Sequence, residues 1–327
     1  MKKRTVIIVA AAMIAMAAGL LAATCLGAKN IPIKTVIESL FHYREELDMM
    51  LVRDSRLPRA LCSALVGGLL AMAGAMMQGI TRNSIAEPSI MGVTQGAVLA
   101  VAIASVSSSV YGILGYSISA FTGAMLGGVL VLLFSMQSAS NMRLSRLLMA
   151  GTAMSTFFLS MASLVALIGN RSQELAFWIS GGFRTATWKY VWLLAAIGGI
   201  CTLFALIMSH KINIVSLGDD VAVGLGVKPT RVRIQTVALI IPICAVCVAA
   251  AGNIAFVGLI IPHIVRKTLG NDFRRLIPVS FLGGAALLTW ADVAAKLVNQ
   301  PYETPIGLFS SLIGIPIFIS LVRREKG

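Results

Sequence analysis

The feature that most constrains this chain is an uncharged stretch of 55 residues, from Pro88 to Met142. About 20 apolar residues in a helix cross the hydrocarbon core of a bilayer, so this stretch is too long for one spanning helix. It predicts two helices that fold back on each other. The serines within 105–109 and the glycines at 112 and 115 are typical of a turn between them.

The composition also indicates a membrane protein. The chain is 57% hydrophobic and 12% charged, whereas soluble domains carry roughly 25% charged residues. Its apolar runs are longer than the strands of about ten residues in an outer-membrane barrel. We expect a single transmembrane domain over residues 1–327 in contact with the lipid bilayer. The net charge of +14 comes from basic residues dispersed between apolar runs, which does not indicate nucleic-acid binding.

We predict about ten membrane spans, and one choice decides that number. The stretch 234–262 fits either one long helix or two helices joined at 250–253. With two helices, 17 of the 27 Lys and Arg residues lie on the side of the N-terminus and 10 on the other, but with one helix the split is 11 to 16. The positive-inside rule therefore favours ten spans with both termini in the cytoplasm. The predicted spans cover about residues 5–28, 57–81, 86–106, 113–137, 145–170, 189–209, 232–250, 252–269, 275–298 and 305–322.

Two segments, 59–88 and 233–262, resemble each other faintly. Each begins with an arginine, contains an alanine-rich tetrapeptide that ends in glycine, and ends with a proline. In the ten-span topology the two segments would be inverted relative to each other, which is typical of transporters. A similarity this thin also arises from composition alone, and both interpretations stay open.

Two kinds of energy coupling leave different traces in a transporter sequence. The phosphate-binding motif G-x-x-x-x-G-K-[ST] does not occur in this one, so any ATP must be hydrolysed by a partner. An ion-coupled carrier normally has acidic residues near the bilayer midplane. Here Asp292, in the outer half of its predicted span, is the one thin candidate. An ion-coupled secondary carrier acting alone therefore stays the alternative interpretation.

Sulfur and imidazole side chains could bind a metal, but the sequence favours packing for them. The five cysteines lie inside apolar runs, as do Met72, Met76 and Met77, where such residues usually fill gaps in the core. His263 follows Pro262 with no second ligand nearby, and we expect it at a helix boundary or cap. We predict no metal site and no cofactor bound directly by the chain.

The loop after the sixth predicted span is the most informative part of the sequence. Asp219 and Asp220 would lie in the first turn of a short helix, where acids offset the positive end of the helix dipole. Val221 and Leu225 give this helix a small apolar face, and Gly226 ends it. Such a helix suits a groove on a partner protein, or it is an amphipathic connector. The residues alone leave both interpretations open.

The same loop carries a resemblance to a known family. The sequence LGDDVA at 217–222, followed by LGV at 225–227, resembles the cytoplasmic coupling loop of the FecCD/BtuC-type permeases. These are the membrane subunits of ABC importers for iron-siderophore complexes, haem and cobalamin. Further similar segments follow in the family's order, including RLPR at 56–59, EPSIMG at 87–92 and FVGLIIPHIVR at 256–266. The signature and helix-break residues of the resemblance are Gly74, Gln78, Asn83, Pro88, Gly92, Gly258, Pro262 and His263.

The resemblance implies an all-α integral membrane protein with the type II ABC importer permease fold, which has ten helices and inverted repeats. It would lie in the cytoplasmic membrane of a bacterium and pair with an identical or homologous permease subunit. ABC ATPase subunits would bind ATP-Mg, and an extracytoplasmic binding protein would deliver the substrate. The implied substrate is a ferric siderophore, or a related haem or cobalamin chelate. The chain itself would be a transport subunit and not an enzyme.

The resemblance also implies two functional sites. The coupling loop, residues 213–231, would contact the ATPase through Leu217, Gly218, Asp219, Asp220, Val221, Leu225 and Gly226. On the opposite side of the membrane, Arg56 and Arg59 would meet acidic residues of the binding protein, with Lys296 as a weaker third. Alternatively, these long side chains anchor the helix ends at the membrane interface.

Overall fold

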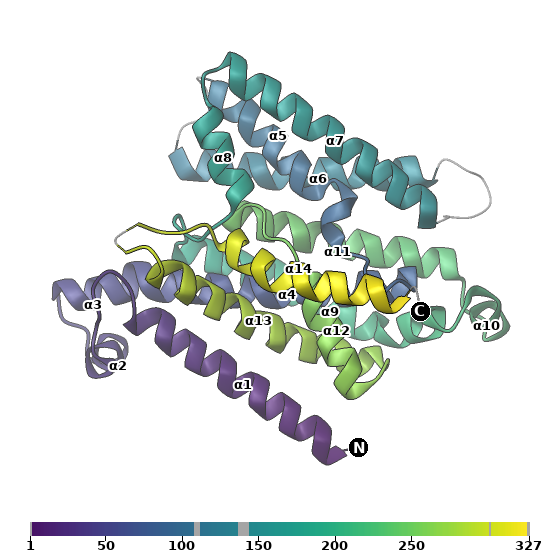
Figure 1. Cartoon of the computed structure of the whole chain (residues 1–327), viewed down its shortest axis with the longest axis horizontal. Coiled ribbons are helices and arrows are strands. Elements are labelled where there is room, and N and C mark those ends of the chain that lie inside the picture. The colour runs from purple at the N-terminus through teal and green to yellow at the C-terminus, as the bar shows by residue number, and fades with distance from the viewer. Residues whose placement is uncertain (1, 108–111, 137–143, 301, 326–327) are drawn as a thin grey trace.

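The computed structural model describes residues 2–107, 112–136, 144–300 and 302–325, and every regular element in these residues is helical (Figure 1). The long helices are α1 (Lys2–Cys25), α4 (Leu57–Thr81), α6 (Gly112–Met136), α7 (Leu144–Ile168), α9 (Trp188–Ser216), α11 (Pro229–Ala251), α13 (Phe273–Leu297) and α14 (Ile306–Glu325). The shorter helices are α2 (Ile33–Phe41), α3 (Leu47–Leu51), α5 (Val93–Val106), α8 (Ser172–Ser180), α10 (Asp219–Gly224) and α12 (Val257–Leu269).

Seven of the described helices are long and apolar enough to cross a membrane, which makes the chain a multi-pass membrane protein. Each of the ten predicted spans contains a helix. Three of these helices are shorter than a full crossing: α5, α12 and the apolar part of α14, Ile306–Ile319. The count of ten spans therefore stays a prediction.

Left-handed backbone conformations shorten two of these helices. Gly92, with φ of 71°, divides the third predicted span into a short 3₁₀ turn and α5. The eighth predicted span becomes helical only at Val257 rather than at residue 252. Gly252 and Phe256, with φ of 66° and 69°, keep the intervening segment out of the helix. Hydrophobic patterns carry no information on such breaks.

The uncharged stretch forms two helices, as predicted. α5 ends at Val106 and α6 begins at Gly112, and the two helices pack against each other. Residues 108–111, within the predicted turn, lie outside the described residues.

The central helix of the bundle is α4. It contacts α1, α9, α11, α12 and α13, and most of its side chains are buried. Glycines allow two of these helices to approach it closely. A Cβ atom on Gly74 would lie 2.0 Å from the carbonyl oxygen of Gly258 in α12, and one on Gly67 would lie 2.2 Å from that of Gly284 in α13. The positions of α12 and α13 are therefore fixed by backbone contact with α4.

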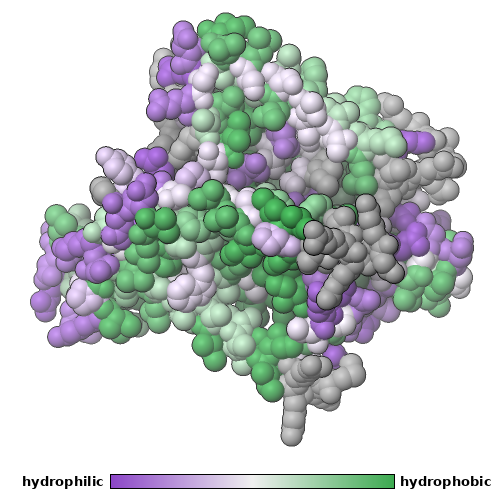
Figure 2. Space-filling view, viewed as in Figure 1, coloured by the Kyte–Doolittle hydropathy of each residue, from purple (hydrophilic) through white to green (hydrophobic). Residues whose placement is uncertain are grey.

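The helices run between two ends of the molecule (Figure 1). The α3 end carries α2 and α3. The α10 end carries α10, the start of α1 and the end of α14. In Figure 2, hydrophobic residues cover much of the middle of the visible face, and hydrophilic residues gather toward the two ends. This distribution is that of a protein whose middle lies in the hydrocarbon core of a bilayer.

Candidate functional site

The predicted coupling loop contains a short helix at the α10 end. Asp219 and Asp220 lie in the first turn of α10, as predicted. The helix ends at Gly224, two residues before the predicted end at Gly226. Gly226 has φ of 76°, a left-handed conformation that residues with a Cβ atom disfavour, so the chain turns there. Before the helix, Gly218 has φ of 129°, which is also a conformation that favours glycine. A glycine in a non-helical conformation therefore lies on each side of α10.

The apolar face of this segment is open. Val221 in α10 and Leu225 directly after it are spaced by four residues and lie on one side of the helix, and Leu217 lies just before the helix, on the far side of Gly218. Their exposed fractions are 67%, 47% and 59%. Val223, on the opposite side, is also exposed, whereas Ala222 is buried against the bundle. An open apolar face on a short helix suits a groove on another protein.

Asp219 connects α10 to two long helices. Its carboxylate accepts hydrogen bonds from both terminal nitrogens of Arg233 on α11, at 2.7 and 3.1 Å. It also lies 3.3 Å from Nη2 of Arg82, directly after α4. Nε of Arg233 donates to the carbonyl oxygen of Ile80 at 3.3 Å. One carboxylate therefore links α10 to both α4 and α11.

A second polar contact at this end joins α9 to α13. Nδ2 of Asn213 donates to Oδ1 of Asp272 at 2.8 Å, and the backbone N–H of Phe273 donates to Oδ1 of Asn213 at 2.7 Å. Asp272 also caps α13 by accepting from the backbone N–H of Arg274. Partial burial raises the pKa of Asp272, but these hydrogen bonds and the charge of Arg275 outweigh it and lower the pKa below its ordinary value. The helix that leads into α10 is thus held in place.

Signature residues from both halves of the sequence meet between α4 and α12. Nε2 of Gln78 donates to the carbonyl oxygens of Gly258 and Leu259, at 3.3 and 3.4 Å. Oε1 of Gln78 accepts from Arg266 at 2.9 Å. Gln78 is 2% exposed, and Gly74 touches Gly258 one turn away. Gln78 and Gly74 on α4 and Gly258 on α12 therefore belong to the same contact between these two helices.

The other signature residues shape the breaks in the helices. Oδ1 of Asn83 accepts from the backbone N–H two residues on, which forms an Asx turn after α4. Pro88 begins the 3₁₀ turn that Gly92 ends. Pro262 is buried inside α12. His263 lies beside it in the middle of this helix, and not at a boundary as expected, because α12 continues through Pro262 to Leu269.

At the α3 end, Arg59 and Lys296 bind the same carboxylate. Asp292 on α13 is fully buried and accepts from Nε and Nη2 of Arg59, at 3.0 and 2.8 Å, and from Nζ of Lys296, at 2.7 Å. Nη1 of Arg59 also donates to Glu303 at 2.5 Å, and Arg184 lies 3.9 Å from that carboxylate. Asp292 is thus held as an ion pair between α4 and α13. Its sequence-based interpretation as an ion-coupling group gains no support from this arrangement.

Arg56 acts as a cap for the end of α1. Its Nη1 donates to the carbonyl oxygens of Thr24 and Cys25, at 3.0 and 2.9 Å, and its Nη2 bonds to that of Lys29. The last carbonyls of a helix have no partner within the helix, and a guanidinium satisfies them well.

The three predicted docking residues line one hollow, which we name the α3-end hollow. It has a volume of about 230 Å³, and its walls include Lys29, Arg56, Arg59, Lys296 and Glu303. Four cations line it, but Arg59 and Lys296 already share Asp292, and Lys29 pairs with Asp48. Arg56 and Arg59 are only 8% and 9% exposed, so a partner would reach them at the wall of the hollow and not as protruding side chains. Their docking role stays a prediction.

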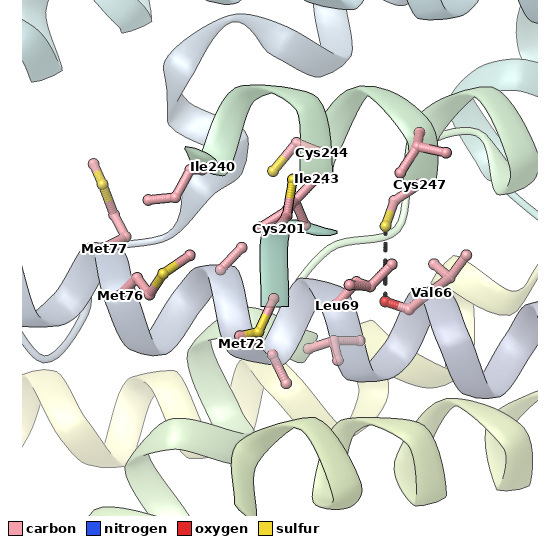
Figure 3. Close-up of a cluster of buried hydrophobic side chains, with 14 of the residues drawn as sticks. Val66, Leu69, Met72, Met76, Met77, Cys201, Ile240, Ile243, Cys244 and Cys247 are labelled. Carbon is pink, nitrogen blue, oxygen red and sulfur yellow. Dashed lines mark hydrogen bonds between the residues drawn. The ribbon is translucent and has the colours of Figure 1, made fainter. Parts of the chain in front are cut away.

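Met72, Met76, Met77 and four of the five cysteines lie in the buried core, in agreement with the packing role predicted from the sequence (Figure 3), whereas Cys25 is half-buried. Sγ of Cys247 lies 4.0 Å from the carbonyl oxygen of Val66. All five cysteines are free thiols. The sulfur-containing side chains of this core come from three helices, α4, α9 and α11: Met72, Met76, Met77, Cys201, Cys244 and Cys247.

Sequence reasoning missed four positioning residues. Arg82 and Arg233 hold Asp219, and Glu303 holds Arg59. Oε1 of Glu87 accepts from the backbone N–H of the residue that precedes α12, at 2.6 Å, which joins the two helix breaks. One signal was available, because Arg233 begins its sequence repeat just as Arg59 does.

Comparisons with known proteins assign this arrangement to a family. The FecCD transport family matches residues 13–324. The chain belongs to the FecCD transport family. It is 41% identical over 322 residues to the iron(3+)-hydroxamate import system permease protein FhuB of Bacillus subtilis. The alignment covers 98% of this chain and 84% of FhuB. It is 36% identical over 327 residues to the iron-uptake system permease protein FeuB of the same organism. This alignment covers 100% of this chain and 98% of FeuB.

The fold of this FecCD member also has a solved counterpart. A structure described as an inward-facing conformation of a metal-chelate type ABC transporter superposes with a TM-score of 0.85 at 28% sequence identity. The match covers 97% of this chain and 99% of the other. As a FecCD family member, the chain is a membrane transport subunit and not an enzyme.

Proposed function

We propose that this chain is the permease subunit of an ABC importer that carries a ferric siderophore into a bacterial cell, driven by ATP hydrolysis on separate subunits. The observation that carries the proposal is the exposed apolar surface of Val221 and Leu225, with Leu217 exposed just before it, on a helix that Asp219 anchors to the bundle. The sequence has no phosphate-binding loop of its own. An ATPase must therefore dock, and α10 offers it a place to do so.

The relatives support the substrate class. FhuB and FeuB are named as permease proteins of iron uptake systems, and FhuB serves iron(3+)-hydroxamate import. Since the chain is 41% identical to FhuB, we place ferric hydroxamate siderophores first among the candidate substrates, ahead of haem and cobalamin.

We further propose that the α10 end faces the cytoplasm and the α3 end faces outward. The start of α1 and the end of α14 lie at the same end as α10 (Figure 1). Termini on one side require an even number of crossings, which ten spans satisfy and seven do not. The larger share of Lys and Arg residues in the ten-span arrangement lies at this end, in agreement with the positive-inside rule.

The proposed assembly places one partner at each surface. ATPase subunits, which bind ATP-Mg, contact α10, and an extracytoplasmic binding protein contacts the α3-end hollow through acidic residues. A second permease subunit, identical or homologous, completes the pathway. The described part of α7 exposes Phe157, Leu164 and Leu167, an apolar surface suited to lipid or to this second subunit.

Growth under iron limitation tests the proposal. A strain that lacks this chain should fail to grow on one or more ferric hydroxamates as sole iron source and recover when the chain is restored. Haem and cobalamin provide the comparison panel. Uptake should stop when ATP is depleted and persist when the proton and sodium gradients are collapsed. Uptake that follows an ion gradient in ATP-depleted cells would instead establish a secondary carrier.

A further inference from the structure

A second hollow, at the α10 end, is lined by basic side chains without counter-charges. This basic hollow has a volume of about 320 Å³ and lies between the end of α9 and the start of α11. Lys211, Lys228 and Arg231 line it and are all exposed. Within the described part of the chain, none of the three forms a side-chain hydrogen bond or ion pair. Among the described residues that line the hollow, none is Asp or Glu.

An apolar strip on α9 leads directly to this hollow. Ile200, Phe204 and Ile207 precede Lys211 at spacings of four, three and four residues, so the four side chains share one helix face. The three apolar residues are 59%, 50% and 64% exposed. The surface is therefore apolar toward the middle of the bundle and cationic at its end. A phospholipid has the same order, with acyl chains in the hydrocarbon core and a phosphate at the interface.

We propose that the basic hollow binds the phosphate of an anionic phospholipid headgroup, with the acyl chains along the α9 strip. Three cations in one hollow repel each other until an anion enters, and near the membrane surface each cation favours an anionic lipid. The guanidinium of Arg231 adds the planar geometry that suits phosphate oxygens. The proposal goes beyond the transport function and does not depend on the substrate. Lys228 and Arg231 lie in the coupling loop, residues 213–231, so the test measures lipid binding and ATPase retention separately.

Native mass spectrometry of the purified, delipidated chain tests this proposal. The probes are phosphatidylglycerol, phosphatidylcholine and inorganic phosphate, added separately. The triple variant Lys211→Gln, Lys228→Gln and Arg231→Gln should bind phosphatidylglycerol at least tenfold more weakly than the wild-type chain. The control variant Lys267→Gln, Arg274→Gln and Arg275→Gln removes the same charge outside the hollow and should bind as the wild-type chain does.

Four results would overturn the proposal. The first is equal retention of phosphatidylglycerol by the triple variant and the wild-type chain. The second is displacement of the lipid by millimolar inorganic phosphate, which would make the hollow a site for free phosphate. The third is a triple variant that keeps the lipid but loses the ATPase subunits on purification, which would assign the three cations to the ATPase contact. Phosphatidylcholine bound as tightly as phosphatidylglycerol would likewise remove the role of charge.

Discussion

Arg233 holds Asp219 by two hydrogen bonds, at 2.7 and 3.1 Å, and so fixes the start of α10 to α11. Arg59 holds Asp292 through two nitrogens in the same way at the α3 end. The two arginines lie near the first turns of α11 and α4, helices that run in opposite directions between the two ends (Figure 1). Two antiparallel helices that each begin near such an arginine are compatible with the faint sequence repeat, and the inverted repeat stays a prediction.

Replacement of Arg233 by methionine should uncouple transport from ATP hydrolysis. Asp219 keeps only its contact with Arg82, so α10 loses its tie to α11. Since Asp219 is half-exposed, the loss of stability should be small, about 1 kcal/mol or less. Uptake into reconstituted vesicles should fall about tenfold, the effect of a 1.4 kcal/mol barrier, while the ATPase subunits stay bound and active. Lys267→Met provides a control at the same end, and an unchanged ratio of uptake to hydrolysis in Arg233→Met would contradict the prediction.

Leu225→Asp should release the ATPase subunits. If Leu217, Val221 and Leu225 are seated in a groove, an aspartate at position 225 places a charge in a dry contact. Burial of an unpaired polar group costs about 2–7 kcal/mol, so the aspartate should weaken binding by several kcal/mol. The permease should still insert and fold, because Leu225 is exposed in the isolated chain. Val223→Asp is the matched control, since it adds the same charge on the opposite side of α10. Copurification of the ATPase with both variants alike would show that this face makes no such contact.

Asp292→Asn should destabilise the fold at the α3 end. It leaves Arg59 and Lys296 as buried cations without their shared carboxylate, and removal of one partner from a buried ion pair costs about 3–5 kcal/mol. Thermal unfolding of the purified chain measures this loss. Adding Lys296→Met to Asp292→Asn should recover part of the stability, because one unpaired cation is gone. A variant that unfolds like the wild-type chain but loses a response to pH gradients would instead support the ion-coupled carrier.

Features that depend on local composition could be predicted from the sequence. The two helices of the uncharged stretch follow from length and apolarity alone, and α5 and α6 form as expected. The position of Asp219 and Asp220 at a helix start follows from the helix dipole. The open apolar face with Val221 and Leu225 follows from helical spacing. In each case the relevant residues are neighbours in the chain.

Contacts between distant residues could not be predicted in the same way. Arg59 and Asp292 are separated by 233 residues, and nothing in the local pattern of either predicts the other. The resemblance implies Arg59 as a docking side chain, which stays a prediction, and its burial in an ion pair with Asp292 could not be read from the sequence. Gly92 is among the helix-break residues that the resemblance implies, and the structure has a break there. The break at Phe256 escaped prediction, since it depends on a backbone conformation imposed by packing.

Cysteine labelling should establish the orientation of the two ends. In a version without native cysteines, Lys34→Cys in α2 should react with an impermeant reagent in intact cells, because the α3 end faces outward. Gly224→Cys at the end of α10 should react only after the membrane is opened. Both positions are exposed, and a Cβ atom at Gly224 would meet no atom within 4 Å. Labelling of Gly224→Cys in intact cells would reverse the proposed topology.

Gly74→Ala should separate α4 from α12. The added Cβ atom would lie 2.0 Å from the carbonyl oxygen of Gly258, a backbone atom that cannot move without shifting the helix. Overpacking of this kind costs about 1–3 kcal/mol, and the shift should also weaken the hydrogen bonds from Gln78 to α12. Gly199→Ala is the control, because its Cβ atom meets nothing within 4 Å and alanine favours a helix by about 0.5–1 kcal/mol over glycine. Thermal unfolding of both purified variants should therefore show a lower midpoint for Gly74→Ala and an unchanged or higher one for Gly199→Ala. Equal midpoints would mean that the contact between α4 and α12 is looser than its backbone distances indicate.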